Sequence, residues 1–222
     1  MGAAKFIAIS PLQDCRIFDD AHHSEHEPIK INVSSLVNVK VCQANWEVDT
    51  ELYGIYEVSD VEQLSAQVEQ AWLGEPLALP ESAILESLQD FRCKIYHLLT
   101  ECGDAKCHAS VMLAVTVKVA EQDAEQLQIW YEEEHLGLMA KVPGWLRSRR
   151  FERVLPAASA TEMRSEVEFL ALYDFEQNHG LQGIAHKAAS ATARTAAIRE
   201  ILRSKDNMVL RHVADLKPST PS

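Results

Sequence analysis

The feature that most constrains how this chain can fold is an internal repeat. The pair Glu25-His26 recurs as Glu134-His135, 109 residues further along. Such self-similarity at a fixed offset indicates two copies of one structural unit. The fold therefore has to be one that can be built twice within a single chain.

Other repeated segments occur in the same order in both halves. ELYGIYEV at 51–58 recurs as EFLALYDF at 168–175, and CKIYHLL at 93–99 has a weaker counterpart in MVLRHVA at 208–214. Collinear matches of this kind favour a tandem duplication. We place the first unit at residues 5–100 and the second at residues 110–215.

Both units have the same pattern of elements, β-α-β-β-α-β. Alternating or β-branched apolar segments predict strands, and apolar residues at helical spacing predict helices. The strands are expected at 5–10, 36–46, 51–58 and 89–99, and then at 110–119, 145–154, 167–175 and 208–216. The helices are expected at 15–33, 60–73, 123–142 and 190–205. This is the ferredoxin-like unit. Two of them can bury their open sheet faces against each other, which predicts an α+β fold forming an intramolecular barrel with helices outside.

Composition narrows the partners. The 222 residues carry a formal charge of −12, and an acidic protein repels phosphate backbones, so we expect no nucleic-acid partner. No apolar run reaches the length of a membrane span and the N-terminus lacks the apolar region of a signal peptide. An odd count of five cysteines suits reduced thiols. We predict a soluble, cytoplasmic protein without a membrane partner.

Residues 22–26, HHSEH, match the H-x-x-E-H signature of one class of zinc peptidases. The corresponding segment of the second unit reads YEEEH and keeps only the Glu-His pair. The repeat thus accounts for Glu25 and His26, no third zinc ligand is evident, and we predict that the protein holds no metal. Glycine-rich nucleotide signatures and the G-x-S-x-G serine hydrolase signature are also absent. We therefore expect no cofactor.

The segment WYEEEHLGLMAKVPGWLRSRRFERV at 130–154 resembles the dimeric α+β barrel superfamily. It is most similar to fungal EthD-like proteins that carry two such units in one chain. These proteins have an aromatic pair, acidic residues, a Glu-His pair and a Val-Pro-Gly-Trp turn. In this chain, the turn ends at Trp145. Unit one departs from this pattern: Ala21-His22 replaces the aromatic pair. The resemblance implies this fold and a role in fungal secondary metabolism, but chemistry varies widely among such relatives.

The helical periodicity of residues 123–142 divides their side chains between an apolar stripe and the rest of the helix surface. At about 100° per residue, one stripe is apolar and Glu134 and His135 flank its centre, whereas Glu132 and Glu133 lie outside it. The stripe consists of Leu127, Trp130, Tyr131, Leu138 and Val142. A glutamate in this position can brace the structure through a hydrogen bond, which is the alternative to a catalytic role. A histidine near a carboxylate titrates close to physiological pH and suits proton transfer.

These considerations give two sets of candidate site residues. The predicted catalytic residues are His22, Glu25, His26, Tyr131 and His135. The predicted substrate-binding residues are Tyr53, Tyr56, Tyr96, His97, Trp130 and Trp145. Strand parity places Tyr96 and His97 on opposite faces of their sheet, without indicating which face is inward. The basic residues Arg147, Arg149, Arg150 and Arg153 are expected to form solvated salt bridges.

Side-chain volume suggests where a pocket would lie. Trp130, Tyr131 and Trp145 are bulky and should fill the interior of unit two. The corresponding segments of unit one contain the small residues Ala21, Ser34 and Ser35, which leave room. We therefore expect the cavity on the unit-one side, with His22 or His26 at its wall.

Our leading functional hypothesis is a cofactor-independent lyase or isomerase, such as a cyclase, cycloaddition catalyst or decarboxylase. Its partner would be an apolar polyketide- or terpenoid-like small molecule, as the resemblance implies. One alternative is a cofactor-free monooxygenase of electron-rich phenols or anthrones. A second is a non-catalytic barrel that binds a ligand or a partner protein. The sequence leaves a homodimer of the whole chain open.

Overall fold

The computed structural model describes residues 6–12, 36–44, 51–58, 94–106, 108–154 and 165–216. The chain divides into two compact units. Unit one contains β1, β2, β3 and the start of β4, and unit two contains the remainder of β4 and the elements from β5 through most of β8. Both units contain antiparallel strands, and the described part of unit two also contains helices. The helices expected at 15–33 and 60–73 lie outside the described residues.

Unit one has an antiparallel sheet. Strand β3 (Glu51–Val58) pairs with β1 (Phe6–Leu12) on one side and with β2 (Leu36–Ala44) on the other. The first residues of β4 (Lys94–Gly103) pair with β1. The strand order is β2-β3-β1-β4. A continuous apolar run at the start of β1 and alternating valines in β2 are both patterns typical of strands.

Unit two repeats this strand order. Strand β5 (Val111–Ala120) lies between β7 (Glu166–Phe175) and β8 (Leu202–Leu216), and β6 (Trp145–Arg153) pairs with β7. The order β6-β7-β5-β8 is therefore second, third, first and fourth along the chain, as in unit one. This is the arrangement of a ferredoxin-like sheet.

The sheets also share an irregularity. In unit one the register of β2 against β3 shifts between Leu36, which pairs with Val58, and Asn38. In unit two the register of β6 against β7 shifts between Trp145, which pairs with Phe175, and Arg147. Leu36 and Trp145 are 109 residues apart, the same offset as the Glu-His pairs. The extra residue therefore falls at the corresponding position in each sheet.

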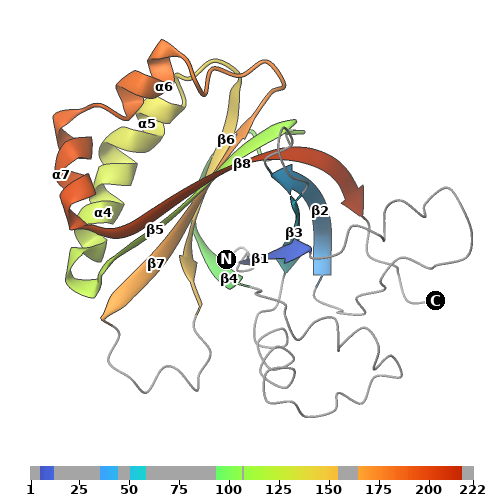
Figure 1. The fold of residues 1–222 in the computed structure, drawn as a ribbon, viewed down its shortest axis with the longest axis horizontal. Helices are drawn as coiled ribbons and strands as arrows, with labels where there is room; N and C mark the ends of the chain where they lie inside the picture. Colours follow the sequence, from blue (N-terminus) through green and yellow to red (C-terminus); the bar gives the residue numbers. More distant parts are fainter. Residues whose placement is uncertain are drawn as a thin grey trace, which may run out of the picture. The chain divides into compact units, whose positions relative to one another are not determined.

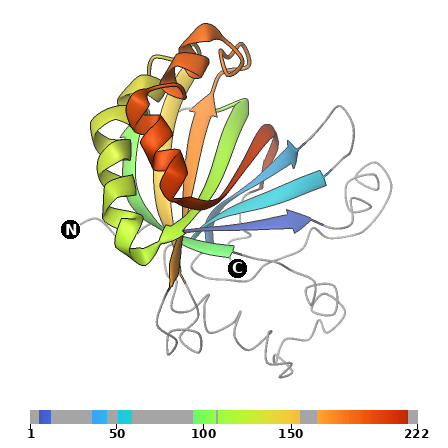
Figure 2. The ribbon, with the colours of Figure 1, turned by 60° about the vertical axis from the view of Figure 1, so that its left-hand side comes forward.

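One face of the unit-two sheet is covered by helices (Figures 1 and 2). The first helical segment is continuous and consists of η2 (Glu121–Asp123), α4 (Ala124–Trp130), η3 (Tyr131–His135) and α5 (Leu136–Met139). The other two helices are α6 (Ile184–Ala189) and α7 (Ala193–Ile201). Odd-numbered residues of β5 and β7 face them and form the apolar core, from Val111 to Val119 and from Val167 to Phe175.

The first helical segment contains a π-helical turn at η3. A π turn accommodates one extra residue, so the residues after it are displaced relative to an unbroken α-helix. His135 and Met139 consequently take the places over the sheet that Glu134 and Leu138 would occupy. Met139 is 1% exposed, whereas Leu138 is only half-buried. Of the predicted apolar stripe, Leu127, Trp130, Tyr131 and Val142 lie in the core and Leu138 packs against it, while Met139 is buried in addition.

Several predicted boundaries differ from the observed ones. The helix predicted at 190–205 is wrong at its end, because α7 stops at Ile201 and β8 begins at Leu202. Pairing of Leu202 with Val119 and of Lys205 with Val117 in the sheet overrides the helical pattern of that segment. Helix α6 was not predicted, and β4 extends to Gly103, into the segment expected to join the units.

Candidate functional site

A cavity of about 170 Å³ lies within unit two, between the sheet and the helices that cover it. Its sheet side is apolar and is formed by Leu113, Val115 and Val117 of β5. The remaining lining residues come from β7, β8 and all three helical segments. The apolar and aromatic ones are Leu127, Trp130, Tyr131, Met139, Tyr173, Ile198 and Leu202, and the polar ones are His135, His186, Ser190, Thr195, Arg199, Lys205 and Asn207.

Four rings form one cluster at this cavity. His135 stacks on Trp130, with centroids 4.2 Å apart, and meets the edges of Tyr131 at 5.4 Å and Tyr173 at 6.2 Å. Trp130 and Tyr131 also contact each other edge to face at 4.6 Å. Such contacts fix the orientation of each ring. The structure thus brings together three of the predicted site residues, Trp130, Tyr131 and His135.

Three residues of the cavity wall carry buried polar atoms without a partner. These atoms are Nε1 of Trp130 and Nδ1 of His135, which have no hydrogen-bond partner among the described residues, and the hydroxyl of Tyr173, which lies close to the Tyr131 hydroxyl without forming a hydrogen bond of full geometry. Buried polar atoms are nearly always satisfied in native proteins. Two hydrogen-bond donors and one ring nitrogen in a single cavity wall therefore indicate a polar ligand or ordered water.

His135 is held in its neutral form. Burial, followed by the positive charge of Lys205, lowers the pKa of His135 from 6.5 to about 4. A hydrogen bond to the backbone at Ala189 acts in the opposite direction. Because a carbonyl can only accept, the ring nitrogen in that bond carries the proton. Nδ1, which has no described partner, is then left as the lone-pair acceptor.

Both tyrosines remain protonated at neutral pH. Burial raises the pKa of Tyr131, although the nearby Arg150 guanidinium acts against the rise. Burial, reinforced by Tyr131, raises the pKa of Tyr173 well above its ordinary value. A protonated Tyr173 hydroxyl can donate a hydrogen bond to a ligand oxygen.

The guanidinium group of Arg150 stacks on the ring of Tyr131. Its guanidinium carbon lies 3.8 Å from the centroid of the Tyr131 ring, and its Nη1 donates to Oε1 of Gln128. The side chain is 1% exposed, and within the described part of the chain no carboxylate forms an ion pair with it. Burial lowers the pKa of Arg150. Stacking on Tyr131 therefore provides much of the compensation for this buried cation.

The cavity opens at a cationic rim. Arg199 of α7 and Lys205 of β8 are exposed and also line the cavity, and His186 of α6 is half-buried beside them. Burial and the charge of Arg199 lower the pKa of Lys205, and burial lowers the pKa of His186. The interior is thus aromatic and the opening is positively charged.

Glu134 has a structural role. Its Oε1 accepts a hydrogen bond from the Thr192 hydroxyl at 2.5 Å, and the Thr192 oxygen accepts one from the Thr195 backbone N–H at 3.0 Å. Thr192 is the N-cap of α7. Glu134 thereby connects the π-helical turn to the start of α7, which contributes Thr195 to the cavity wall. This hydrogen bond is the bracing role that the sequence suggested as the alternative to a catalytic one.

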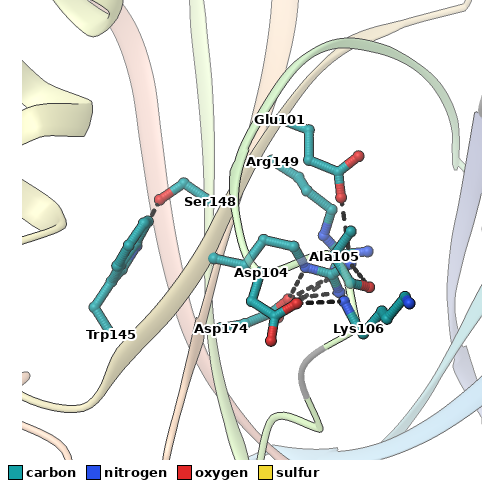
Figure 3. Close-up of polar contacts among 9 residues, drawn as sticks. Glu101, Asp104, Ala105, Lys106, Trp145, Ser148, Arg149 and Asp174 are labelled. Atoms are coloured by element: carbon teal, nitrogen blue, oxygen red, sulfur yellow. Dashed lines mark hydrogen bonds and ion pairs between the residues drawn. The ribbon is translucent and has the colours of Figure 1, made fainter.

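A second polar cluster lies on the other face of the unit-two sheet. Asp174, which is fully buried, accepts from Nε of Arg147 at 2.7 Å and from Nη2 of Arg149 at 3.1 Å. Arg147 also reaches Glu101 at 3.3 Å. Figure 3 shows Arg149 and Asp174 facing each other, with Glu101 close to them. Such a buried network needs all its members to remain compensated.

The sequence-based interpretation of the basic residues of β6 was therefore wrong for three of the four, whereas Arg153, 30% exposed, forms a salt bridge with Glu168. The prediction was solvated salt bridges, but Arg147, Arg149 and Arg150 are 6%, 4% and 1% exposed. The reason is that β7, the neighbouring strand, is buried on both faces from Val167 onward. The continuous apolar run of β7 was the signal that its neighbour would be buried too.

The other predicted site residues are placed as follows. Trp145 is half-buried at the start of β6, where its Nε1 donates to the Ser148 hydroxyl at 2.8 Å, and it does not line the cavity (Figure 3). In unit one, Tyr53 is half-buried on β3, Tyr96 is 2% exposed on β4 and His97 is exposed. Tyr56 pairs with Ala8 in the sheet. His22, Glu25 and His26 lie outside the described residues.

One expectation about the interior of unit two was wrong. Trp130 and Tyr131 were expected to fill it, yet they line a cavity there. The predicted unit-one cavity, with His22 or His26 at its wall, lies outside the described residues and stays a prediction.

Sequence reasoning missed part of the site. Lys205 and Asn207 were assigned to a helix and a following loop, although both lie on the edge strand β8. His186 belongs to the unpredicted α6. Tyr173 was not among the predicted site residues. The one available signal was the repeated Tyr of ELYGIYEV and EFLALYDF, which marks a position shared by both units.

No family model matches the chain, and no curated protein sequence matches it. Similarity is found to solved structures. A protein described as anthrone oxidase-like superposes with a TM-score of 0.61 at 9% identity, covering 99% of this chain and 95% of that one. A candidate monooxygenase from Fusobacterium nucleatum gives 0.52 at 7% identity, covering 98% and 96%.

A third structure is an uncharacterised ferredoxin-fold protein from Listeria monocytogenes related to antibiotic biosynthesis monooxygenases. Its TM-score is 0.52 at 11% identity, and the match covers 96% of both chains. Identities this low show the fold alone. The chain therefore has the ferredoxin-like fold of these proteins. Within the described residues, no helix combines the length and the apolar character needed to cross a bilayer.

Proposed function

We propose that this protein is a cofactor-independent enzyme that converts a small phenolic compound in the unit-two cavity. The observation that carries the proposal is the set of unpartnered polar atoms on Trp130, His135 and Tyr173. A phenol hydroxyl is complementary to this set. It donates one hydrogen bond, which suits Nδ1 of His135, and accepts others, which suit the Trp130 and Tyr173 donors.

Cavity size favours a single ring. A dry apolar cavity of about 150 Å³ holds benzene, and the volume here is about 170 Å³. Pockets for larger ligands typically begin at about 300 Å³. A one-ring phenol therefore fits the cavity, whereas a three-ring anthrone or an extended polyketide chain would need it to expand.

His135 is placed to take the phenolic proton. Its low pKa reflects burial and neighbouring positive charge, both of which oppose an isolated imidazolium. Proton transfer from the phenol creates a phenolate beside that imidazolium, and the two opposite charges offset each other in a site shielded from water. The donors on Trp130 and Tyr173 would stabilise the phenolate oxygen.

Oxygenation is the reaction that we favour for this phenolate. An electron-rich phenolate can react with dioxygen, so that one oxygen atom enters the ring to give a quinone and the other leaves as water. The substrate supplies the electrons, so no cofactor is required. The structural neighbours, which include an anthrone oxidase-like protein, agree with this choice. A redox-neutral lyase or isomerase remains the second hypothesis, since it would use the same anion.

Oxygen uptake tests the proposal. Wild-type protein treated with a chelator is incubated with phenol, catechol and hydroquinone, and dioxygen consumption and quinone absorbance are recorded. We expect catalysed uptake with at least one phenol, lowered about 100-fold in His135→Gln. Exposed His108 provides the control, and His108→Gln should keep the wild-type rate.

Other outcomes would redirect the proposal. Conversion without oxygen uptake would favour the lyase or isomerase hypothesis. Saturable binding without any conversion would favour a binding protein. Equal rates in His135→Gln and wild type would remove His135 from the mechanism.

We also infer that the two units are copies of one another that together form an intramolecular barrel, as in EthD-like proteins. The shared strand order and the register shifts 109 residues apart support this inference. Superposition of Glu25 on Glu134 and of His26 on His135 in an experimental structure is the test. Catalytic roles for His22, Glu25 and His26, substrate contacts by Tyr53, Tyr56, Tyr96 and His97, and a cytoplasmic location remain predictions.

A further inference from the structure

We propose that the substrate carries a carboxylate, which binds at the cationic opening of the unit-two cavity while its ring enters the aromatic interior. This inference rests on the proposed function, because it assigns the class of phenol that the same cavity takes. A hydroxybenzoate is the simplest compound with both groups.

The opening is built from positive side chains. Lys205 is on β8, where it pairs with Val117 and so lies on the face of the sheet that carries the cavity. Arg199 approaches from α7 and is held in place, since its Nη2 donates to the backbone carbonyl of Ser190 at 2.6 Å. His186 of α6 completes the cluster, and Asn207 and Ser190 add uncharged polar groups.

The charge of Lys205 is not balanced locally. Among the described residues, no carboxylate lies within ion-pair distance of Lys205 or Arg199, although the chain as a whole has 33 acidic and 21 basic residues. Burial, followed by the charge of Arg199, lowers the pKa of Lys205, so the two cations also repel each other. An anionic ligand group would relieve that repulsion.

Binding of a carboxylate would also activate the proton acceptor. Lys205 is the charged neighbour that acts most strongly on His135 to lower its pKa. A ligand carboxylate beside Lys205 would cancel much of this effect, so His135 would become a stronger base only when the correct substrate is present. The same group would thus contribute to both binding and catalysis.

Calorimetric titration with two matched phenols tests the inference. The probes are 4-hydroxybenzoate and its uncharged analogue 4-hydroxybenzamide. We expect wild-type protein to bind the carboxylate about fivefold more tightly at low salt, a modest factor because the rim is exposed and screened. This preference should shrink as the salt concentration rises.

Variants locate the interaction. Lys205→Met should abolish the preference and leave binding of the amide within about twofold of wild type. Arg203→Met removes the same charge from an exposed β8 residue outside the cavity lining and should keep the preference. Lys205→Gln serves as a second variant if Lys205→Met does not fold.

The outcomes separate this inference from the proposed function. If the amide binds but the carboxylate binds no better, the carboxylate site is wrong and the phenol cavity stands. An equal loss of preference in Lys205→Met and Arg203→Met would show a general charge effect and would also overturn the site. Failure of both probes to bind would contradict both proposals.

Discussion

His135 stacks on Trp130 with ring centroids 4.2 Å apart and ring planes inclined by 22°. The π-helical turn at η3 makes this contact possible, because it rotates His135 over the sheet. The stacked ring is shielded from water yet lines a cavity. Its proton affinity and its position are therefore consequences of the same local irregularity in the helix.

The first prediction concerns stability at low pH. Below pH 6.5 the unfolded chain takes up a proton at His135, whereas the folded protein takes it up only near the lowered pKa of about 4. The unfolded state thus binds more protons in this window, and stability falls as the pH is lowered. We expect His135 to account for a loss of up to about 3 kcal/mol.

Urea denaturation midpoints between pH 7 and pH 4 measure this loss. The His135→Gln variant should show a flatter dependence than wild type, while the His108→Gln control should follow wild type. If His135→Gln and wild type lose stability in parallel, His135 is not a buried neutral histidine.

The second prediction concerns the cap of α7. Thr192→Ala removes the acceptor for the Thr195 backbone N–H and the donor to Glu134. We expect a loss of about 1 kcal/mol in the free energy of unfolding. Thr192→Ser keeps both hydrogen bonds and should remain close to wild type. Equal stability of the alanine and serine variants would show that the link between η3 and α7 contributes nothing.

The sequence predicted much of this fold because its signals were local. The strand at 51–58 of unit one coincides with β3, and the predicted ranges for the unit-two strands overlap the observed ones. Those segments alternate or are continuously apolar, which is a pattern that pairing in a sheet reinforces.

The site was less predictable because its geometry depends on tertiary contacts. A π turn inserts one residue without changing the apolar pattern. The sequence therefore could not show which side of the helix His135 faces. Lys205 belongs to a segment with helical spacing, and only its pairing with Val117 makes it part of the sheet. Burial of Arg150 required knowing that Tyr131 lies over it.

The third prediction concerns Asp174. Asp174→Asn removes the charge that compensates Arg147 and Arg149, both of which are buried. An uncompensated buried charge is costly, and we expect a loss of about 3 kcal/mol or more. Exposed Glu176 is the matched control, and Glu176→Gln should change stability by less than about 0.5 kcal/mol. A loss in Asp174→Asn no larger than that of the control would contradict the proposed balance of charges.

The fourth prediction contrasts two glycines. Gly144 has a φ of +77°, and a Cβ there would lie 2.7 Å from the Asn178 carbonyl oxygen. Gly144→Ala should therefore destabilise the protein by more than about 1 kcal/mol. Gly137 is helical with nothing within 4 Å of an added Cβ, so Gly137→Ala should stabilise by about 0.5–1 kcal/mol. Thermal melts of both variants measure the two changes in stability, which we expect to have opposite signs.

The most direct test of the central claim follows the histidine ring itself during ligand binding. Protein labelled at its histidine side chains is titrated with phenol, and the ring resonances are assigned with the His135→Gln variant. We predict a saturable shift of the His135 resonances, with His108 and His179 unchanged because neither lines the cavity. A saturable shift confined to other histidines, or no shift of His135 at saturating phenol, would contradict a phenol site in the unit-two cavity.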